Sequence, residues 1–94
     1  MDDLELFNRL ARLARPAHTA YVPIADLSTP FPETGLDSMD GFMISIFYAD
    51  IYGVPDAVSK EFTFTTPAEL LVLIHQHKTT EPASIDEAMG RVQW

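Results

Sequence analysis

One serine in this chain stands where a loop gives way to an apolar helix. The sequence around it reads Glu33-Thr34-Gly35-Leu36-Asp37-Ser38-Met39-Asp40. Asp37 is well placed as the helix N-cap, because its carboxylate can accept the unpaired N–H groups of the first turn. The Ser38 hydroxyl is then free to point outward, and Gly35 allows a positive φ or the close approach of another protein's backbone. Ser38 is therefore a candidate site for covalent modification.

The other polar side chains do not form a recognisable catalytic or metal-binding set. His75 and His77 are two residues apart, so on a helix they point in roughly opposite directions and cannot chelate one metal ion. His18 is too isolated to act as a base for Ser38, and no Gly-x-Ser-x-Gly motif surrounds that serine. Capping explains the two flanking aspartates more simply than binding of a divalent ion does. The sequence thus predicts neither a metal site nor an enzyme.

The charge of the chain limits its partners. The sequence holds 6 basic and 14 acidic residues, which gives a net charge of -8. Nucleic-acid binding is disfavoured, because affinity for phosphate backbones depends on Lys and Arg. No Lys or Arg occurs from Pro16 to Ser59, and Ser38 lies inside this segment. Its acidic residues are Asp26, Glu33, Asp37, Asp40, Asp50 and Asp56. They form either a solvated acidic surface or, beside a modification site, a surface that steers basic partners.

Length and composition indicate one small soluble domain. A chain of 94 residues without cysteine has room for a single modest core and has no disulfide framework or thiol nucleophile. Its apolar runs are too short for a membrane span, and the acidic start Met1-Asp2-Asp3 is unlike a secretory signal. We therefore expect a cytoplasmic protein, and a monomer is the simplest expectation.

The first helix is expected over about 3–15, where apolar residues recur at helical spacing before Pro16. Three arginines, Arg9, Arg12 and Arg15, form a short basic stripe on this helix. We expect them to be solvated or paired with nearby carboxylates rather than to bind an anion.

A long loop over 17–36, packed by its own apolar side chains, leads to the second helix, expected over 38–52 and ended by Gly53. This second helix is apolar on two opposite sides. Ile44, Tyr48, Ile51 and Tyr52 cluster on one side, and Met39, Phe42, Met43 and Ile46 cluster with Asp50 on the other. One side must face the core, and the other packs under another element or forms an exposed interface. The periodicity does not decide which side is which.

Two further helices are expected after the second. A two-turn helix over 56–62 would have Asp56 as its N-cap. The run Thr66-Pro67-Ala68-Glu69 combines a capping box with proline at the first helical position, and it starts a helix that ends near Lys78.

The tail from Thr79 has its own helical pattern. Ser84 and Glu87 form another capping box, and apolar residues repeat at helical spacing after it. This pattern is compatible with a short fifth helix that docks on the body, contacts a partner or frays. Trp94 either anchors this segment or is exposed.

The order of these features resembles that of acyl carrier proteins. Gly35-Leu36-Asp37-Ser38-Met39 is similar to the Gly-x-Asp-Ser-Leu attachment motif of that family, with Met39 in place of leucine. The resemblance spans roughly residues 3–78. It implies an all-α bundle of three main helices and one short helix, with residues 79–94 as a C-terminal extension that could add a short helix.

The resemblance also implies a function. A phosphopantetheinyl transferase would attach 4'-phosphopantetheine from coenzyme A to Ser38, and the thiol of this arm would hold acyl groups as thioesters. The carrier, itself not an enzyme, would serve fatty-acid, polyketide or related lipid biosynthesis through partners such as ketosynthases or acyltransferases. Leu36, where peptidyl carriers tend to have a second glycine, favours an acyl cargo over an aminoacyl one. Phe62 and Phe64 would then cover an acyl-binding cleft or seal the core.

The resemblance selects the side of the second helix that partners would contact. The implied partner contacts are Asp40, Phe42, Met43, Ile46, Asp50 and Asp56, together with Met39 of the motif. Familiar carriers have several glutamates along this helix, whereas here apolar residues prevail, which suggests a dedicated carrier that binds partners through apolar contacts. The alternative is a small helical interaction module that is never modified and uses this apolar face to bind a groove. That alternative predicts that Ser38→Ala leaves function intact.

Overall fold

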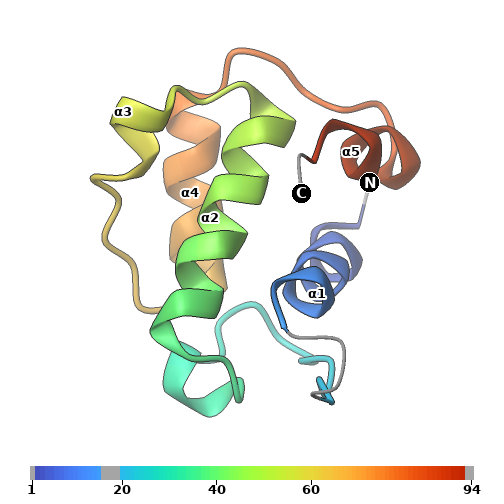
Figure 1. Cartoon of the computed structure of the whole chain (residues 1–94), viewed down its shortest axis with the longest axis vertical. Coiled ribbons are helices and arrows are strands. Elements are labelled where there is room, and N and C mark those ends of the chain that lie inside the picture. Colours follow the sequence, from blue (N-terminus) through green and yellow to red (C-terminus); the bar gives the residue numbers. More distant parts are fainter. Residues whose placement is uncertain (1, 16–19, 93–94) are drawn as a thin grey trace.

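The computed structural model describes residues 2–15 and 20–92, which form five α-helices and one 3-10 turn (Figure 1). In chain order these are α1 (Asp3–Ala14), η1 (Phe31–Glu33), α2 (Ser38–Tyr52), α3 (Asp56–Ser59), α4 (Pro67–His77) and α5 (Ile85–Arg91). The predicted all-α fold is confirmed. The roles considered for Pro16, His18 and Trp94 fall on residues outside the described ranges.

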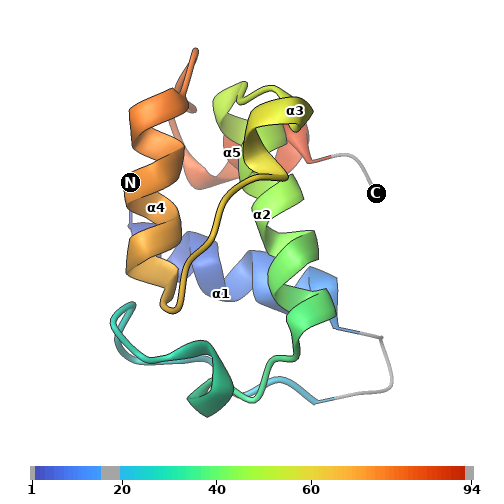
Figure 2. The same cartoon turned by 90° about the vertical axis from the view of Figure 1, so that its left-hand side faces the viewer.

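The central element is α2, which packs against each of the other four α-helices. Two views at right angles show α4 beside α2 and α1 crossing them at a steep angle (Figures 1 and 2). The long loop closes the end of the molecule at which α2 begins (Figure 2). No helix among the described residues is long and apolar enough to cross a membrane.

The core is built on one side of α2. Ile44, Tyr48 and Ile51 are fully buried there, whereas Met39 and Phe42 are 66% and 51% exposed on the other side. The remaining helices supply the apolar side chains that pack against α2 in this core: Leu6, Phe7, Leu10, Ala11, Leu70, Leu71, Ile74 and Ala88. Tertiary packing thus settles which of the two apolar sides of α2 faces inward.

Helix ends follow the predicted capping chemistry at α2 and α4, only in part at α5, and not at α3. Thr66 and Glu69 form the predicted reciprocal capping box of α4. At α5 the Ser84 hydroxyl accepts a hydrogen bond from the Glu87 N–H, but the predicted box is incomplete because the Glu87 carboxylate pairs with Arg91. The prediction for the third helix is wrong, since α3 is a single turn whose N-cap is Pro55. Because the fixed φ of Pro55 already suits the residue before the helix, Asp56 falls inside the first turn and makes no capping hydrogen bond.

The fifth helix docks on the body. Ala88 is fully buried and Val92 is 8% exposed, and both belong to the same core as α1, α2 and α4. Arg91 Nη1 donates a hydrogen bond to the Ile51 carbonyl at 2.9 Å, and its Nη2 pairs with Glu87 at 2.6 Å. Of the three arrangements open for this helix, the structure therefore shows the docked one.

Gly53 ends α2 in a conformation that only glycine adopts at low cost, with φ of 67°. We expect Gly53→Ala to lower the free energy of unfolding by about 1 to 2 kcal/mol through backbone strain alone. A further loss is expected because the added Cβ would overlap Thr79 Oγ1, which donates a hydrogen bond to the Gly53 carbonyl. Urea denaturation of the variant and of wild type measures the free energy of unfolding of each protein.

The matched control for this prediction is Gly90→Ala. Gly90 lies within α5, and a Cβ added there meets nothing within 4 Å. This substitution should raise stability by about 0.5 to 1 kcal/mol, because alanine has the higher helix propensity. Equal effects at the two glycines would contradict the geometry at Gly53.

Tyr48 carries a buried hydroxyl that has no hydrogen-bond partner among the described residues. Burial raises the pKa of Tyr48 well above the ordinary value of 10.0, so the folded state keeps the phenol neutral where the unfolded chain ionises. Tyr48 therefore leaves the free energy of unfolding unchanged below about pH 10, and it lowers this free energy progressively as the pH rises from there toward the raised pKa of the folded state. We expect the free energy of unfolding of Tyr48→Phe at neutral pH to equal that of wild type or to exceed it by up to about 1 kcal/mol. Above pH 10 the variant should lose less stability than wild type.

Thermal unfolding at pH 7 and at a series of alkaline pH values measures how Tyr48→Phe changes the stability of the protein. Tyr21 and Tyr52 also have pKa values raised by burial, so part of the alkaline loss should persist in the variant. A Tyr48→Phe variant that is clearly less stable than wild type at pH 7 would show that the hydroxyl is satisfied in solution.

Candidate functional site

The turn before Ser38 is held by local hydrogen bonds and by burial. Thr34 Oγ1 donates to the Phe31 carbonyl at 2.6 Å and accepts a hydrogen bond from the Leu36 N–H at 3.2 Å. Gly35 has a φ of 81° and so turns the chain in a way that favours glycine. Leu36 is 6% exposed and anchors the turn in the core. The loop therefore reaches α2 in a fixed conformation.

A reciprocal capping box starts α2, and Asp37 is its N-cap as predicted. Asp37 Oδ1 accepts a hydrogen bond from the Asp40 N–H at 2.8 Å, and Asp40 Oδ2 accepts one from the Asp37 N–H at 3.2 Å. Ser38 is the first residue of the helix and is exposed. The capping is thus carried by its neighbours, and Ser38 remains accessible to another protein.

A guanidinium from α1 also binds this junction. Arg15 Nη1 donates to the Gly35 carbonyl at 2.6 Å and to Asp40 Oδ2 at 3.2 Å. The resemblance implies that Asp40 is a partner contact, but the structure leaves it only 5% exposed. Its carboxylate is engaged inside the protein because it completes the capping box and pairs with Arg15. Of the arginine stripe, Arg9 pairs with Glu5 and Arg15 pairs with Asp40.

A groove with a volume of about 470 Å³ lies beside Ser38. It runs between η1, the first two turns of α2 and the segment 59–64. Its apolar walls are formed by Phe31, Leu36, Phe42, Phe62 and Phe64. The Phe31 and Phe64 ring centroids are 5.4 Å apart, which ties the long loop to the segment after α3. An exposed serine and an apolar groove are therefore neighbours.

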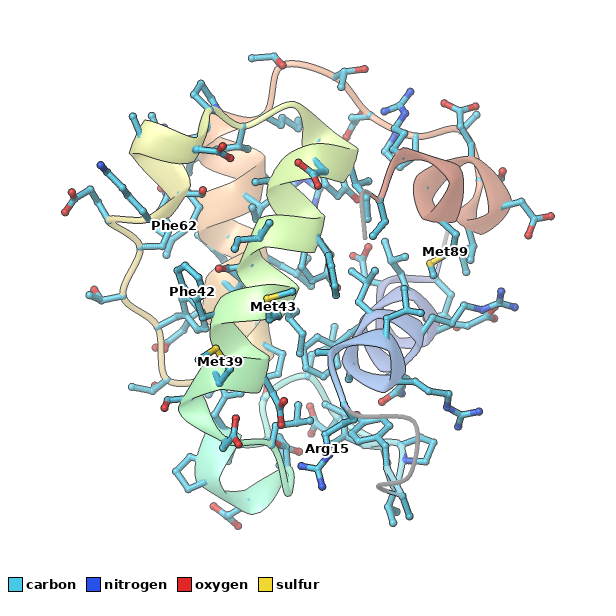
Figure 3. The ribbon with its side chains drawn as sticks, viewed as in Figure 1. Arg15, Met39, Phe42, Met43, Phe62 and Met89 are labelled. Atoms are coloured by element: carbon cyan, nitrogen blue, oxygen red, sulfur yellow. The ribbon has the colours of Figure 1, made fainter. Side chains whose placement is uncertain are left out.

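The proposed partner face of α2 is partly exposed. Met39 and Phe42 are exposed, whereas Met43, Ile46 and Asp50 are half-buried. Figure 3 shows Met39 and Met43 on the viewer's side of α2, with Phe42 lying toward Phe62 across the groove. Asp56, at the start of α3, is exposed. Apart from Asp40, the predicted contacts thus keep at least part of their surface accessible.

The clear pKa shifts lie away from Ser38. Hydrogen bonds from Thr65 lower the pKa of Glu69 at the start of α4, and a hydrogen bond from Lys78 lowers the pKa of Glu81. Within the described ranges, no cluster of His, Asp and Glu is arranged to hold a metal ion.

Ser38, its cap Asp37 and Gly35 could be predicted from the local sequence, whereas Arg15 could not be predicted as part of the site. The partners of Arg15 lie 20 and 25 residues away, and no local pattern links such distant positions. Of the two roles open for Phe62 and Phe64, the packing against the core is observed, and both side chains also line the groove. Comparison of the chain with models of known protein families, with curated proteins and with solved structures found no match.

Proposed function

We propose that this chain is a cytoplasmic acyl carrier protein that is modified on Ser38 with 4'-phosphopantetheine from coenzyme A. The observation that carries the proposal is the setting of Ser38. It is exposed at the first position of α2, in a junction held by hydrogen bonds, at one end of an apolar groove. The resemblance of residues 35–39 to the attachment motif of acyl carriers also supports Ser38 as the attachment residue.

Attachment requires one phosphoryl-transfer step. The Ser38 Oγ attacks the coenzyme A phosphorus that bears the pantetheine, and a new O–P bond forms. The bond from this phosphorus to the bridging oxygen breaks, and adenosine 3',5'-bisphosphate leaves with the electron pair. The serine proton would pass to a base of the transferase. The chain itself would contribute an accessible hydroxyl at the first position of α2.

The groove beside Ser38 fits an attached arm and its cargo. The arm would supply a thiol that holds an acyl group as a thioester. Phe31, Phe42 and Phe62 provide an apolar surface against which an acyl chain can be removed from water. A cavity of about 470 Å³ lies within the range of small-molecule binding sites.

Partner enzymes would approach along α2. Met39 and Phe42 offer exposed apolar contact area next to Ser38, and Asp50 and Asp56 add negative charge in a segment without Lys or Arg. We expect the partners to have an apolar docking surface with basic residues around it. These partners would include a phosphopantetheinyl transferase and acyl-processing enzymes such as ketosynthases or acyltransferases.

The exposure of Met39 and Phe42 also favours a second candidate function. An interaction module that is never modified could insert these two side chains into a groove of its partner. Both candidates use the same helix face, but only the carrier requires the Ser38 hydroxyl.

The test is modification of the purified chain. The protein is incubated with coenzyme A and a broad-specificity phosphopantetheinyl transferase, and its intact mass is measured. A gain of one phosphopantetheine group supports the carrier. An unchanged mass, with circular dichroism showing the helical fold and a known carrier modified in parallel, would reject the carrier for that transferase and favour the interaction module.

A further inference from the structure

Arg15 connects the end of α1 to both sides of the Ser38 junction. It follows α1 directly as the C-cap residue. One nitrogen of its side chain, Nη1, contacts the Gly35 carbonyl before the serine and the Asp40 carboxylate after it. The Arg15 side chain is 19% exposed and that of Asp40 is 7% exposed. Figure 3 shows Arg15 at the end of the molecule where α2 begins.

Ser38 lies between the two contacts of Arg15. Gly35 belongs to the turn, and Asp40 belongs to the capping box, so a single guanidinium ties the turn to the helix. Both contacts are charge-assisted hydrogen bonds, which are stronger than neutral ones. The low exposure of the pair limits screening by solvent. Without Arg15, the turn would keep its local hydrogen bonds and the buried Leu36 but would lose the hydrogen bond that joins it to the end of α1.

We infer that Arg15 is a positioning residue for the modification of Ser38, an inference that rests on the proposed function. Its guanidinium holds the Ser38 hydroxyl in the orientation that an incoming phosphorus requires. The expected signature is a loss in kcat of the transferase with little change in KM, because the surface that the transferase contacts stays the same while the reacting atom is held less firmly.

The structure offers a matched control at the other end of α2. Arg91 also bridges a backbone carbonyl and a carboxylate, through the Ile51 carbonyl and Glu87. Its side chain is 29% exposed. Arg91→Met therefore removes the same kind of bridge as Arg15→Met, but at the end of α2 away from Ser38. If a change in the kinetics of modification results from general destabilisation of the protein, it should appear in both variants.

Transferase kinetics are measured with wild type, Arg15→Met, Arg15→Lys and Arg91→Met as protein substrates. We expect Arg15→Met to lower kcat by about tenfold, with KM changed by less than about twofold. Arg91→Met should stay within about twofold of wild type in both constants. Arg15→Lys should recover part of the loss, because lysine keeps the charge but lacks the fork of donors that arginine has.

Amide hydrogen exchange provides a readout that does not depend on the transferase. The Asp37 and Asp40 N–H groups both donate into the capping box. We expect their exchange to be about tenfold faster in Arg15→Met, while the amide of the buried residue Leu70 stays protected. Arg91→Met should leave the exchange of Asp37 and Asp40 unchanged.

The outcomes separate this inference from the proposed function. An unmodified wild type would reject the carrier function and with it a role for Arg15 in modification, and exchange would still report whether Arg15 holds the junction. A modified wild type, with equal kcat for Arg15→Met and Arg91→Met, would reject the inference alone. Should Arg15→Met fail to fold, Arg15→Lys decides: a lowered kcat with Leu70 protected supports the inference, and wild-type kinetics overturn it.

Discussion

Ser38→Ala is expected to show no gain in mass under conditions that convert wild type completely to the phosphopantetheinylated form. The variant lacks the only atom of residue 38 that can form the new O–P bond. Its fold should be intact, because Ser38 is exposed and alanine has the higher helix propensity. We expect its free energy of unfolding to lie within about 0.5 kcal/mol of that of wild type. Intact mass and circular dichroism measure the two properties on one sample.

Ser28→Ala is the control for this loss. Ser28 is an exposed serine of the long loop, and its N–H donates a hydrogen bond to Asp26 Oδ1. Its hydroxyl can be removed without changing the α2 junction, so this variant should be modified as completely as wild type. Modification of Ser38→Ala, or loss of modification in Ser28→Ala, would contradict the assignment of Ser38 as the attachment residue.

Features set by neighbouring residues could be predicted from the sequence. The Gly53 end of α2, the capping box at Thr66 and Glu69, and the N-cap role of Asp37 all follow from interactions within about one helical turn. These interactions have strong residue preferences and leave a readable pattern. The helix order and the all-α fold could therefore be predicted before the structure was known.

Features set by distant residues could not be predicted in the same way. Asp40 has the pattern of a solvent-exposed first-turn acid, but a guanidinium 25 residues earlier in the chain buries it. Asp56 has the pattern of an N-cap, but Pro55 takes that position and leaves Asp56 in the first turn. The two apolar sides of α2 are equivalent in periodicity, and only the packing of α1, α4 and α5 distinguishes them. Long-range contacts thus decide the composition of the site.

Ile44→Ala is expected to lower the free energy of unfolding by about 2 to 5 kcal/mol, the usual range for truncating a fully buried aliphatic side chain. Ile44 is 0% exposed on the core side of α2, so the substitution leaves a cavity as well as losing apolar burial. For a small domain this is a large part of the total stability. Urea denaturation measures the loss, and an unchanged slope m would show that the same surface is exposed on unfolding.

Phe42→Ala is the matched variant on the opposite side of the same helix. It removes a larger side chain than Ile44→Ala, yet Phe42 is 51% exposed, and we expect a loss below about 1 kcal/mol. If α2 presents this side to partners, Phe42→Ala should raise KM for the transferase while the protein remains folded, because it removes binding surface rather than the reacting atom. Similar unfolding losses in the two variants would contradict the assignment of the core and partner sides. A weaker transferase interaction in Phe42→Ala, at near-normal stability, would mark this side of α2 as the docking face.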